Sequence, residues 1–269
     1  KSSKIILLYM FKEKILIPDK FIFNIIKKDK YKERNYPEYF YPEFKSFTNE
    51  IKMQDDDIEE FKQKRKIGEN DSYLCKLIRN DSINDFIVFS NKMNLNLSSA
   101  IEYSIYETNA ALLKKKHVSL IEYAAFYGSI NIFKYLFLNK VQLKSSLLKY
   151  AIHGNNTELI HLIEEKNIVS ENKLYKICLK ESIKTYNEDF TNYFKNKLSE
   201  NETDKETDFV FVNNLHYFNF VNMRCNEHSN ANIETPISCY LLFKYNYITV
   251  VDFLSKNKKI NYNGKINVF

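Results

Sequence analysis

The chain has 269 residues and a mass of 32.2 kDa, which exceeds the usual single-core domain and favours either two small domains or one elongated repeat array. Its 44% hydrophobic residues, with 20 Tyr and 21 Phe, exclude a disordered chain, and its four Gly and four Pro are too few for turn-dense all-β folds or glycine-rich phosphate loops. Of the net charge of +6, the first 53 residues carry +5, but their lysines are scattered among Ile, Phe and Tyr and form no basic block. We therefore expect helices joined by short polar loops, and the charge pattern does not favour a nucleic acid or a membrane as the partner.

The first 67 residues are predicted to form a helical segment. Lys4–Lys14 and Phe21–Lys28 carry apolar residues at three- and four-residue spacings, which predicts two short helices. Residues 36–47 contain two prolines among aromatic residues, and we interpret them as an extended segment because proline blocks helix propagation. Residues 54–66 begin with acids and end with bases, an order that suits the dipole of one helix.

A repeated pattern begins near residue 70. Residues 119–136, SLIEYAAFYGSINIFKYL, match residues 146–163, SLLKYAIHGNNTELIHLI, at an offset of 27 residues. Weaker copies lie at residues 71–89, 180–194 and 235–254, so five copies are visible. The positions that keep their character in the two best copies are Leu120/Leu147, Tyr123/Tyr150, Ala124/Ala151, Ile132/Leu159, Phe133/Ile160 and Leu136/Ile163.

Each copy has the same internal order. A first apolar segment with small residues at its centre is followed by a break and then by a second segment whose apolar residues are three and four apart. The breaks fall at Asn80-Asp81, Gly128, Gly154-Asn155 and Asn246, residue types that tolerate the left-handed conformation at helix ends. This order predicts a helix pair, and because one pair cannot bury its apolar faces alone, repetition predicts stacked pairs with a continuous core.

These segments resemble ankyrin repeats, whose pattern runs Thr-Pro-Leu-His, an apolar residue, Ala-Ala, two variable residues, Gly, and then Ile-Val and a leucine run. The block at residues 68–161 is similar to divergent protist ankyrin-repeat families, in which a helical front precedes more regular repeats. The resemblance covers residues 70–263 and departs from the family in two ways. Thr-Pro survives only at Thr235-Pro236, and the hairpin signature is largely missing, so we expect no long β-hairpin fingers between the middle repeats.

Together these patterns predict an all-α fold: an ankyrin-like, right-handed solenoid of stacked helix pairs behind an N-terminal helical capping segment. The predicted organisation is a helical segment at residues 1–67, divergent ankyrin-like repeats at 68–198, an acidic loop at 199–208, and a degenerate repeat followed by a C-terminal repeat at 209–269.

The resemblance implies a non-enzymatic module that binds an unidentified partner protein through the concave groove of the array. In such proteins the two variable residues at the end of each first helix often contact the partner, and Arg and aromatic side chains contribute most to interface energies. Two alternatives stay open: a nucleic-acid or anionic-membrane binder using the basic N-terminal segment, and an enzyme with unrecognised chemistry. The implied groove residues are Arg79, Asn80, Phe126, Tyr127, His153, Gly154, Lys184, Thr185, Lys244 and Tyr245; for Phe126 and Tyr127 the alternative is packing on the adjacent repeat.

No residues point to catalysis, a cofactor, a metal or a small-molecule ligand. The signatures of phosphate loops, zinc proteases and serine hydrolases are missing from the sequence. Glu158 and His161 form half of a di-iron motif without the second half, and we interpret His153 as a helix-capping group and residues 114–117 as an exposed loop. The remaining group of potential metal ligands, which fits no zinc-finger spacing, comprises His216, Cys225, His228 and Cys239.

The four cysteines lie far apart without a C-x-x-C pair, which favours reduced thiols and a cytoplasmic location. The longest apolar run, Ile5–Phe11, is far shorter than the roughly 20 residues that span a bilayer. Because the first residue is Lys and not an initiator Met, a targeting signal upstream of this sequence stays open.

Overall fold

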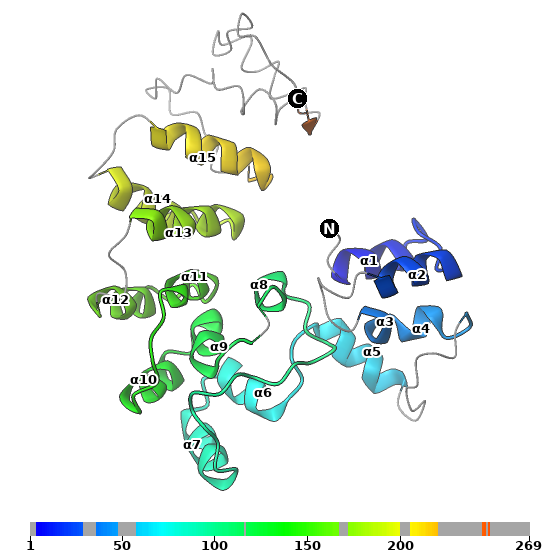
Figure 1. Ribbon diagram of the computed structural model, residues 1–269, viewed down its shortest axis with the longest axis horizontal. Coiled ribbons are helices and arrows are strands. Elements are labelled where there is room, and N and C mark those ends of the chain that lie inside the picture. The colour runs from blue at the N-terminus through cyan, green and yellow to red at the C-terminus, as the bar shows by residue number, and fades with distance from the viewer. Residues whose placement is uncertain are drawn as a thin grey trace, which may run out of the picture. The chain divides into compact units, whose positions relative to one another are not determined.

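The computed structural model of the protein describes residues 4–28, 36–47, 58–115, 117–166, 172–199, 205–219, 244–245 and 247. Over these ranges the chain forms fifteen α-helices and no strand, and its extended pairing is limited to one isolated bridge between Ala100 and Ser119 (Figure 1). The all-α prediction is therefore confirmed for the described residues. The chain divides into two compact units, Lys1–Gln142 (unit 1) and Leu143–Phe269 (unit 2), and each is described by itself below.

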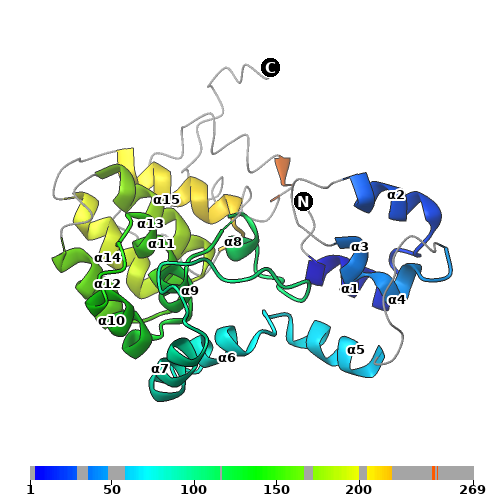
Figure 2. The same ribbon diagram turned by 60° about the horizontal axis from the view of Figure 1, so that its bottom comes forward.

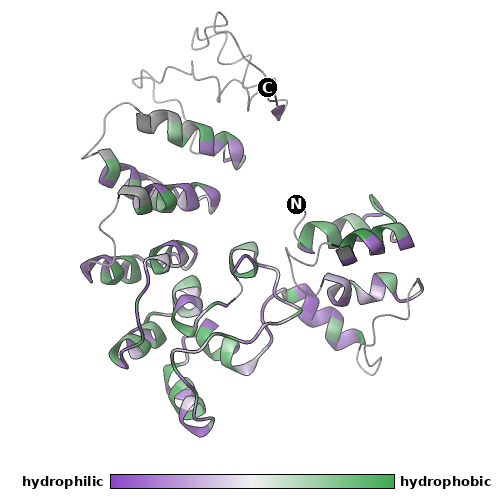
Figure 3. Ribbon diagram, viewed as in Figure 1, coloured by the Kyte–Doolittle hydropathy of each residue, from purple (hydrophilic) through white to green (hydrophobic). Residues whose placement is uncertain are grey.

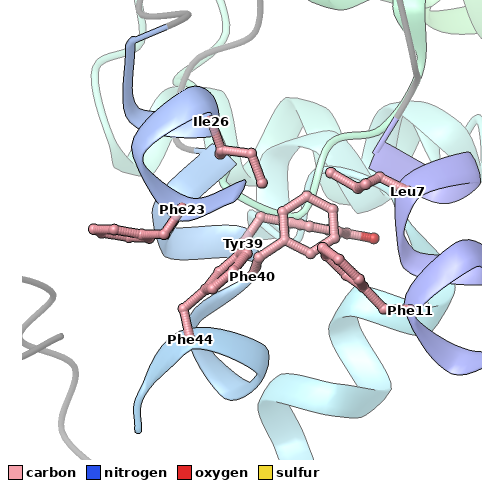
Figure 4. Packing of buried hydrophobic residues seen from close by; sticks show 7 residues of the cluster. All are labelled: Leu7, Phe11, Phe23, Ile26, Tyr39, Phe40 and Phe44. Carbon is pink, nitrogen blue, oxygen red and sulfur yellow. The ribbon is translucent and has the colours of Figure 1, made fainter. Parts of the chain in front are cut away.

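The front of unit 1 is built around aromatic residues. Its helices are α1 (Lys4–Lys12), α2 (Lys20–Lys28), α3 (Tyr36–Tyr39), α4 (Tyr41–Phe44) and α5 (Ile58–Ile67), so the three predicted helices are confirmed within the described residues. Edge-to-face ring pairs, with centroids 5.5 Å apart for Phe11 and Phe40, fix the packing. The core cluster comprises Leu7, Phe11, Phe23, Ile26, Tyr39, Phe40 and Phe44 (Figure 4).

The prediction of an extended segment at residues 36–47 is wrong. This stretch forms the two short helices α3 and α4, and a proline stands in the first turn of each. Proline is compatible with the first turn because the N–H that it lacks would have no intrahelical partner there. The helices place Tyr39, Phe40 and Phe44 in the core, each completely buried.

A buried lysine joins the front of unit 1 to a distant loop. The Lys4 side chain is fully buried, and its Nζ donates to the carbonyl oxygens of Ile105 at 2.8 Å and Glu107 at 3.0 Å. The same ammonium lies 4.9 Å from the ring centroid of Tyr39, a distance at which cation–π attraction is significant. The first described helix is thereby fixed to residues about one hundred positions later in the chain.

The rest of unit 1 contains two helix pairs. They are α6 (Tyr73–Arg79) with α7 (Ile83–Lys92), and α9 (Leu120–Tyr127) with α10 (Ile130–Leu138), and the short helix α8 (Ala110–Leu113) lies in the connection between them. Helix α6 contacts α9, and α7 contacts α10, so the second pair stacks on the first. Ala124 and Ala125 are completely buried, as the small residues at the centre of the first segment predict.

Unit 2 also contains helix pairs that stack through their first helices. Its helices are α11 (Ser146–His153), α12 (Thr157–Glu165), α13 (Asn172–Lys184), α14 (Glu188–Ser199) and α15 (Lys205–His216). Helix α11 contacts α13, and α13 contacts α15, so the first helices of successive pairs lie side by side in both views (Figures 1 and 2). The twelve residues matched at the 27-residue offset, six in each unit, are all buried, which confirms their predicted place in the core.

Two helices overlap the ends of residues 199–208, the range predicted as an acidic loop. Ser199 is the last residue of α14, and Lys205 to Asp208 belong to the first turn of α15; residues 200–204 lie outside the described part. Carboxylates at the start of a helix are favourable because they oppose the positive end of its dipole, so an acidic sequence there does not require a loop. The helix anticipated in the degenerate repeat after residue 208 is present as α15.

One turn recurs after every first helix and after α15. Its central residue has positive φ: +49° at Asp81, +69° at Gly128, +48° at Asn155, +59° at Tyr186 and +58° at Phe218. The N–H of this residue donates to the carbonyl three positions back, at distances from 2.9 to 3.3 Å, which closes the helix end. The predicted breaks at residues 81, 128 and 155 are confirmed, and the one at Asn246 lies outside the described residues.

The turns also join neighbouring pairs. Ser129 Oγ donates to the carbonyl oxygen of Ile78 at 2.5 Å, and Asn219 Nδ2 donates to that of Ile183 at 2.8 Å; in each case the residue after one turn reaches the helix end of the preceding repeat. The Asp81 carboxylate accepts from the backbone N–H of Ile132 at 2.9 Å, and so caps the start of α10 from the preceding turn. Backbone groups at helix ends thus find partners in the adjacent pair.

Candidate functional site

The candidate positions lie at the ends of the first helices, α6 and α9 in unit 1 and α11 and α13 in unit 2. Two positions before the positive-φ residue of each turn stands one of the side chains that the sequence implied for partner binding: Arg79, Phe126, His153 and Lys184. Because the turn is the same each time, the two side chains of each unit leave equivalent points of their helices.

In unit 2 this position is built around one carboxylate. His153 Nε2 lies 2.9 Å from Glu181 Oε1, Lys184 Nζ lies 2.6 Å from the same oxygen, and Lys149 Nζ lies 4.0 Å from Glu181 Oε2. We call Glu181, His153, Lys184 and Lys149 the Glu181 cluster. The Glu181 side chain is 9% exposed, whereas that of Lys149 is 36% exposed, so the carboxylate lies beneath cations that reach the surface.

The surroundings of Glu181 keep it ionised. Burial by itself would raise the pKa of this carboxyl, but the hydrogen bonds from His153 and Lys184 and the charges of Lys184 and Lys149 outweigh burial and lower the pKa to about 2. An ionised carboxylate only accepts hydrogen bonds, so Nε2 of His153 carries the hydrogen that points to it. Two lysines around one carboxylate leave an excess of positive charge at this surface.

In unit 1 the equivalent position holds a guanidinium. Arg79 Nη1 donates to Tyr123 Oη at 2.9 Å and to the carbonyl oxygen of Asn70 at 2.7 Å, while its Nε lies 2.8 Å from Glu69 Oε2. The Arg79 side chain is only 12% exposed, and its guanidinium carbon lies 5.8 Å from the ring centroid of Tyr127. Burial raises the pKa of both tyrosines, so their hydroxyls stay protonated. Arg79 therefore connects two repeats inside unit 1.

The two contacts are structural equivalents. Arg79 stands two residues before the turn residue Asp81, and His153 stands two residues before the turn residue Asn155. Their partners also correspond: Tyr123 stands five residues before Gly128, and Glu181 stands five residues before Tyr186. The donor–acceptor separation is 2.9 Å in both. The end of one first helix thus contacts the same point of the next first helix in each unit.

The expectation that Phe126 is an exposed groove residue is wrong. Its side chain is 6% exposed, and its ring packs edge-to-face against Tyr127 of the same helix, with centroids 5.1 Å apart. The alternative of packing on the adjacent repeat stays a prediction. The reason is that α9 is apolar around most of its circumference, and all its residues except the last are buried. Tyr127 is half-buried.

The other implied groove residues are distributed over both units. Asn80 is exposed and ends α6, and Gly154 and Thr185 are half-buried at the ends of α11 and α13. Lys244 is exposed beside Tyr245, whose ring lies 5.5 Å from that of Phe218 in the turn after α15. The structure brings together His153 and Lys184, through Glu181, and it keeps Arg79 in a separate cluster.

Only some of the potential metal ligands lie within the described residues. Of the potential zinc ligands, His216 is exposed, whereas Cys225, His228 and Cys239 lie outside the described residues. His161 of the partial di-iron motif is 62% exposed and faces Glu164 at 3.8 Å. Where side chains are described, no group of three or more His, Cys, Asp or Glu is placed to hold a metal ion.

Among the helices of the described part, none is both long enough and apolar enough to cross a membrane.

Residues 114, 115 and 117 of the predicted exposed loop are described and lie outside the helices; Lys114 and His117 are exposed, and the Lys115 side chain is 35% exposed. Lys115 is half-buried and pairs with Glu122, which also accepts from the Ser119 N–H at 3.0 Å in a capping box at the start of α9. The basic residue stabilises a helix start here, because Glu122 is buried and its charge needs a partner.

Sequence reasoning missed Glu181 and Lys149, which complete the cluster around His153. The signal that could have found Glu181 is its place five residues before Tyr186, the residue equivalent to Gly128 and Asn155. That alignment depends on recognising Tyr186 as a turn residue, although tyrosine seldom adopts positive φ.

Comparisons of the chain with protein-family models, with curated proteins and with solved structures find no match.

Proposed function

We propose that this chain is a non-enzymatic protein-binding module, a solenoid of the ankyrin type that contacts its partner with side chains at the ends of the first helices. The observation that carries the proposal is the recurrence of one turn at five places, with hydrogen bonds from each of two turns to the preceding repeat. Within each unit, first helices that meet at equivalent points present a row of side chains, which is the kind of surface that such arrays use for recognition.

The Glu181 cluster is the part of this row that suits a partner best. Lys149 and Lys184 are 36% and 26% exposed, and the Glu181 carboxylate beneath them holds their ammonium groups in place, so part of the ordering cost has been met before binding. The excess of positive charge favours an acidic segment of the partner protein. The corresponding side chains of unit 1 are Asn80 and Tyr127, beside the internally bonded Arg79.

The proposal is tested by capturing the partner from a lysate of the cells that supply the sequence, using the full chain as bait. A Lys149→Gln/Lys184→Gln variant removes both surface charges while keeping side-chain length. We expect it to lose most of the captured protein. A matched variant, Lys66→Gln/Lys92→Gln, changes two exposed lysines of unit 1 and should capture as the wild type does.

Circular dichroism on each variant establishes that the helices are retained. The proposal fails if the Lys149/Lys184 variant is folded and captures the same protein at wild-type strength, or if both lysine pairs reduce capture equally, since the second result would indicate a general effect of charge. An experimental structure in which the pairs twist with the opposite hand would reject the ankyrin-type solenoid separately from the binding role.

A further inference from the structure

Exposed apolar side chains concentrate on α1, α2 and the turn between them. Seven large apolar residues within 21 positions are each more than half exposed, and the two most exposed, Ile17 and Phe21, reach 74% and 71%. Figure 3 shows hydrophobic residues along both helices, together with hydrophilic ones. We call this set the α1–α2 apolar face; it comprises Ile5, Ile6, Tyr9, Ile15, Ile17, Phe21 and Ile25.

The apolar face is separate from the core of unit 1. The core side of α1 is formed by Leu7 and Phe11, and that of α2 by Phe23 and Ile26, and these four residues already pack with α3 and α4. Each helix therefore has apolar residues on its outer side as well. Single exposed apolar residues are ordinary, but α1 exposes three large apolar residues, α2 two and the turn between them two more, and such a concentration marks a surface that binds something.

Exposed lysines accompany the apolar face. Lys12, Lys14, Lys20 and Lys27 are all exposed in the same stretch, and the acids among them are Glu13 and Asp19. Asp19 Oδ1 accepts from the backbone N–H of Ile22 at 2.7 Å, so its carboxylate is engaged at the start of α2. The face thus combines large apolar side chains with net positive charge.

We propose that the α1–α2 apolar face binds the surface of an anionic lipid bilayer. Lysine is depleted at the cores of protein–protein interfaces, whereas helices that lie at a membrane surface combine Lys with Ile and Phe. The lysine stems extend along the apolar surface and bring their ammonium groups to the phosphate level, while Phe21 and the isoleucines enter the acyl boundary. The nine residues of each helix are too few to span a bilayer, so the helices lie on it. This role is independent of the proposed protein-binding function.

The test is flotation of the full chain with vesicles of phosphatidylcholine alone and of phosphatidylcholine with phosphatidylserine. We expect binding to the anionic vesicles to be at least on the order of tenfold stronger, and to weaken as salt is added. Phe21→Ser/Ile25→Ser should reduce this binding by on the order of tenfold or more. The matched control, Val88→Ser/Leu138→Ser, changes two residues that are 67% and 77% exposed elsewhere and should bind as the wild type does.

A charge variant, Lys12→Gln/Lys20→Gln, separates the two contributions, because it should weaken binding to anionic vesicles and leave the residual binding to neutral vesicles unchanged. Three results would overturn the proposal. The first is equal or no binding to the two kinds of vesicle. The second is a wild-type dimer that Phe21→Ser/Ile25→Ser converts to a monomer, because a second copy then covers the face. The third is a lowered melting temperature in that variant alone, which would mean that the face is covered within the chain.

Discussion

In unit 1, Arg79 at the end of α6 donates to the neutral hydroxyl of Tyr123, whereas in unit 2, His153 at the end of α11 meets the carboxylate of Glu181. The two contacts join equivalent points of successive first helices at the same separation, so the packing of the helices fixes where the side chains meet, and the sequence selects the chemistry. In unit 1 the result is a buried cation with fixed charge. In unit 2 the result is an ionised carboxylate that loses its charge only in strong acid, because the pKa of Glu181 is lowered to about 2.

The largest effects are expected where the two units do not differ. Leu136 and Ile160 are buried in the second helices α10 and α12, so Leu136→Ala and Ile160→Ala should each lower the free energy of unfolding by about 2–5 kcal/mol, because each leaves a cavity. Urea unfolding measures both. Leu138→Ala, at a residue that is 77% exposed, is the control and should change stability by no more than about 0.5 kcal/mol. A loss at Leu138 as large as that at Leu136 would contradict the assigned core.

Lowering the pH should weaken the contact of Glu181 in unit 2 and leave the charge of Arg79 in unit 1 unchanged. The pKa of Glu181 is lowered to about 2, so its ionised form stabilises the fold above the ordinary carboxyl pKa of 4.5, and this contribution is lost as the pH falls from about 5 toward 2. It amounts to about 3 kcal/mol at neutral pH. The difference in unfolding free energy between wild type and Glu181→Gln, measured by urea titration, should therefore shrink as the pH falls over this range. A difference that stays constant with pH would show that Glu181 is not held ionised.

The fixed charge in unit 1 can be removed by Arg79→Met, which keeps the apolar stem of the side chain. Loss of the bonds to Tyr123 and Glu69 should cost about 2 kcal/mol, since hydrogen bonds of charged groups contribute more than neutral ones. In a Tyr123→Phe background the cost should be smaller, because one partner is already gone. A double-mutant cycle by urea unfolding measures the coupling, and equal costs in both backgrounds would reject the Arg79–Tyr123 contact.

The smallest effect is expected at a turn. Lys140 follows α10 with φ at +60°, and its N–H donates to the carbonyl oxygen of Phe137 at 3.0 Å, so it has the conformation that glycine adopts at Gly128. Lys140→Gly should raise the melting temperature, corresponding to about 0.5–1 kcal/mol, because glycine has no Cβ to strain. Lys144→Gly, at an exposed residue without positive φ, should give no gain. Stabilisation by both changes would point to an effect on the unfolded chain instead.

The sequence predicted the elements that depend on local pattern. Helical spacing identified the pairs, and the 27-residue offset identified twelve core residues, because ten of them are Leu, Ile, Phe or Ala and the other two are the matched Tyr123 and Tyr150. Asp81, Gly128 and Asn155 were recognised as breaks because Asp, Gly and Asn tolerate positive φ. Tyr186 and Phe218 occupy the same turn and were missed, since an aromatic residue gives no such indication.

The candidate site was predicted less completely, because it depends on the register between repeats. The five turn residues with positive φ, at positions 81, 128, 155, 186 and 218, are separated by 47, 27, 31 and 32 residues. Because the spacing varies, no single repeat length could have paired His153 with Glu181 or Arg79 with Tyr123. Composition also could not tell that Phe126 is buried while Phe21 is exposed, since both stand in apolar helices. That distinction arises only when neighbouring helices cover one side and leave the other open.

The buried Lys4 has a consequence for the order of folding. Its carbonyl partners are 101 and 103 residues later in the chain, so during synthesis α1 leaves the ribosome long before the groups that accept from its ammonium. Until residues 105–107 arrive, that charge must remain in water, and the aromatic cluster around α1 cannot close over it. Closure of this long loop should therefore be a late event in the folding of unit 1, and it should limit the folding rate more than formation of the local helix pairs does.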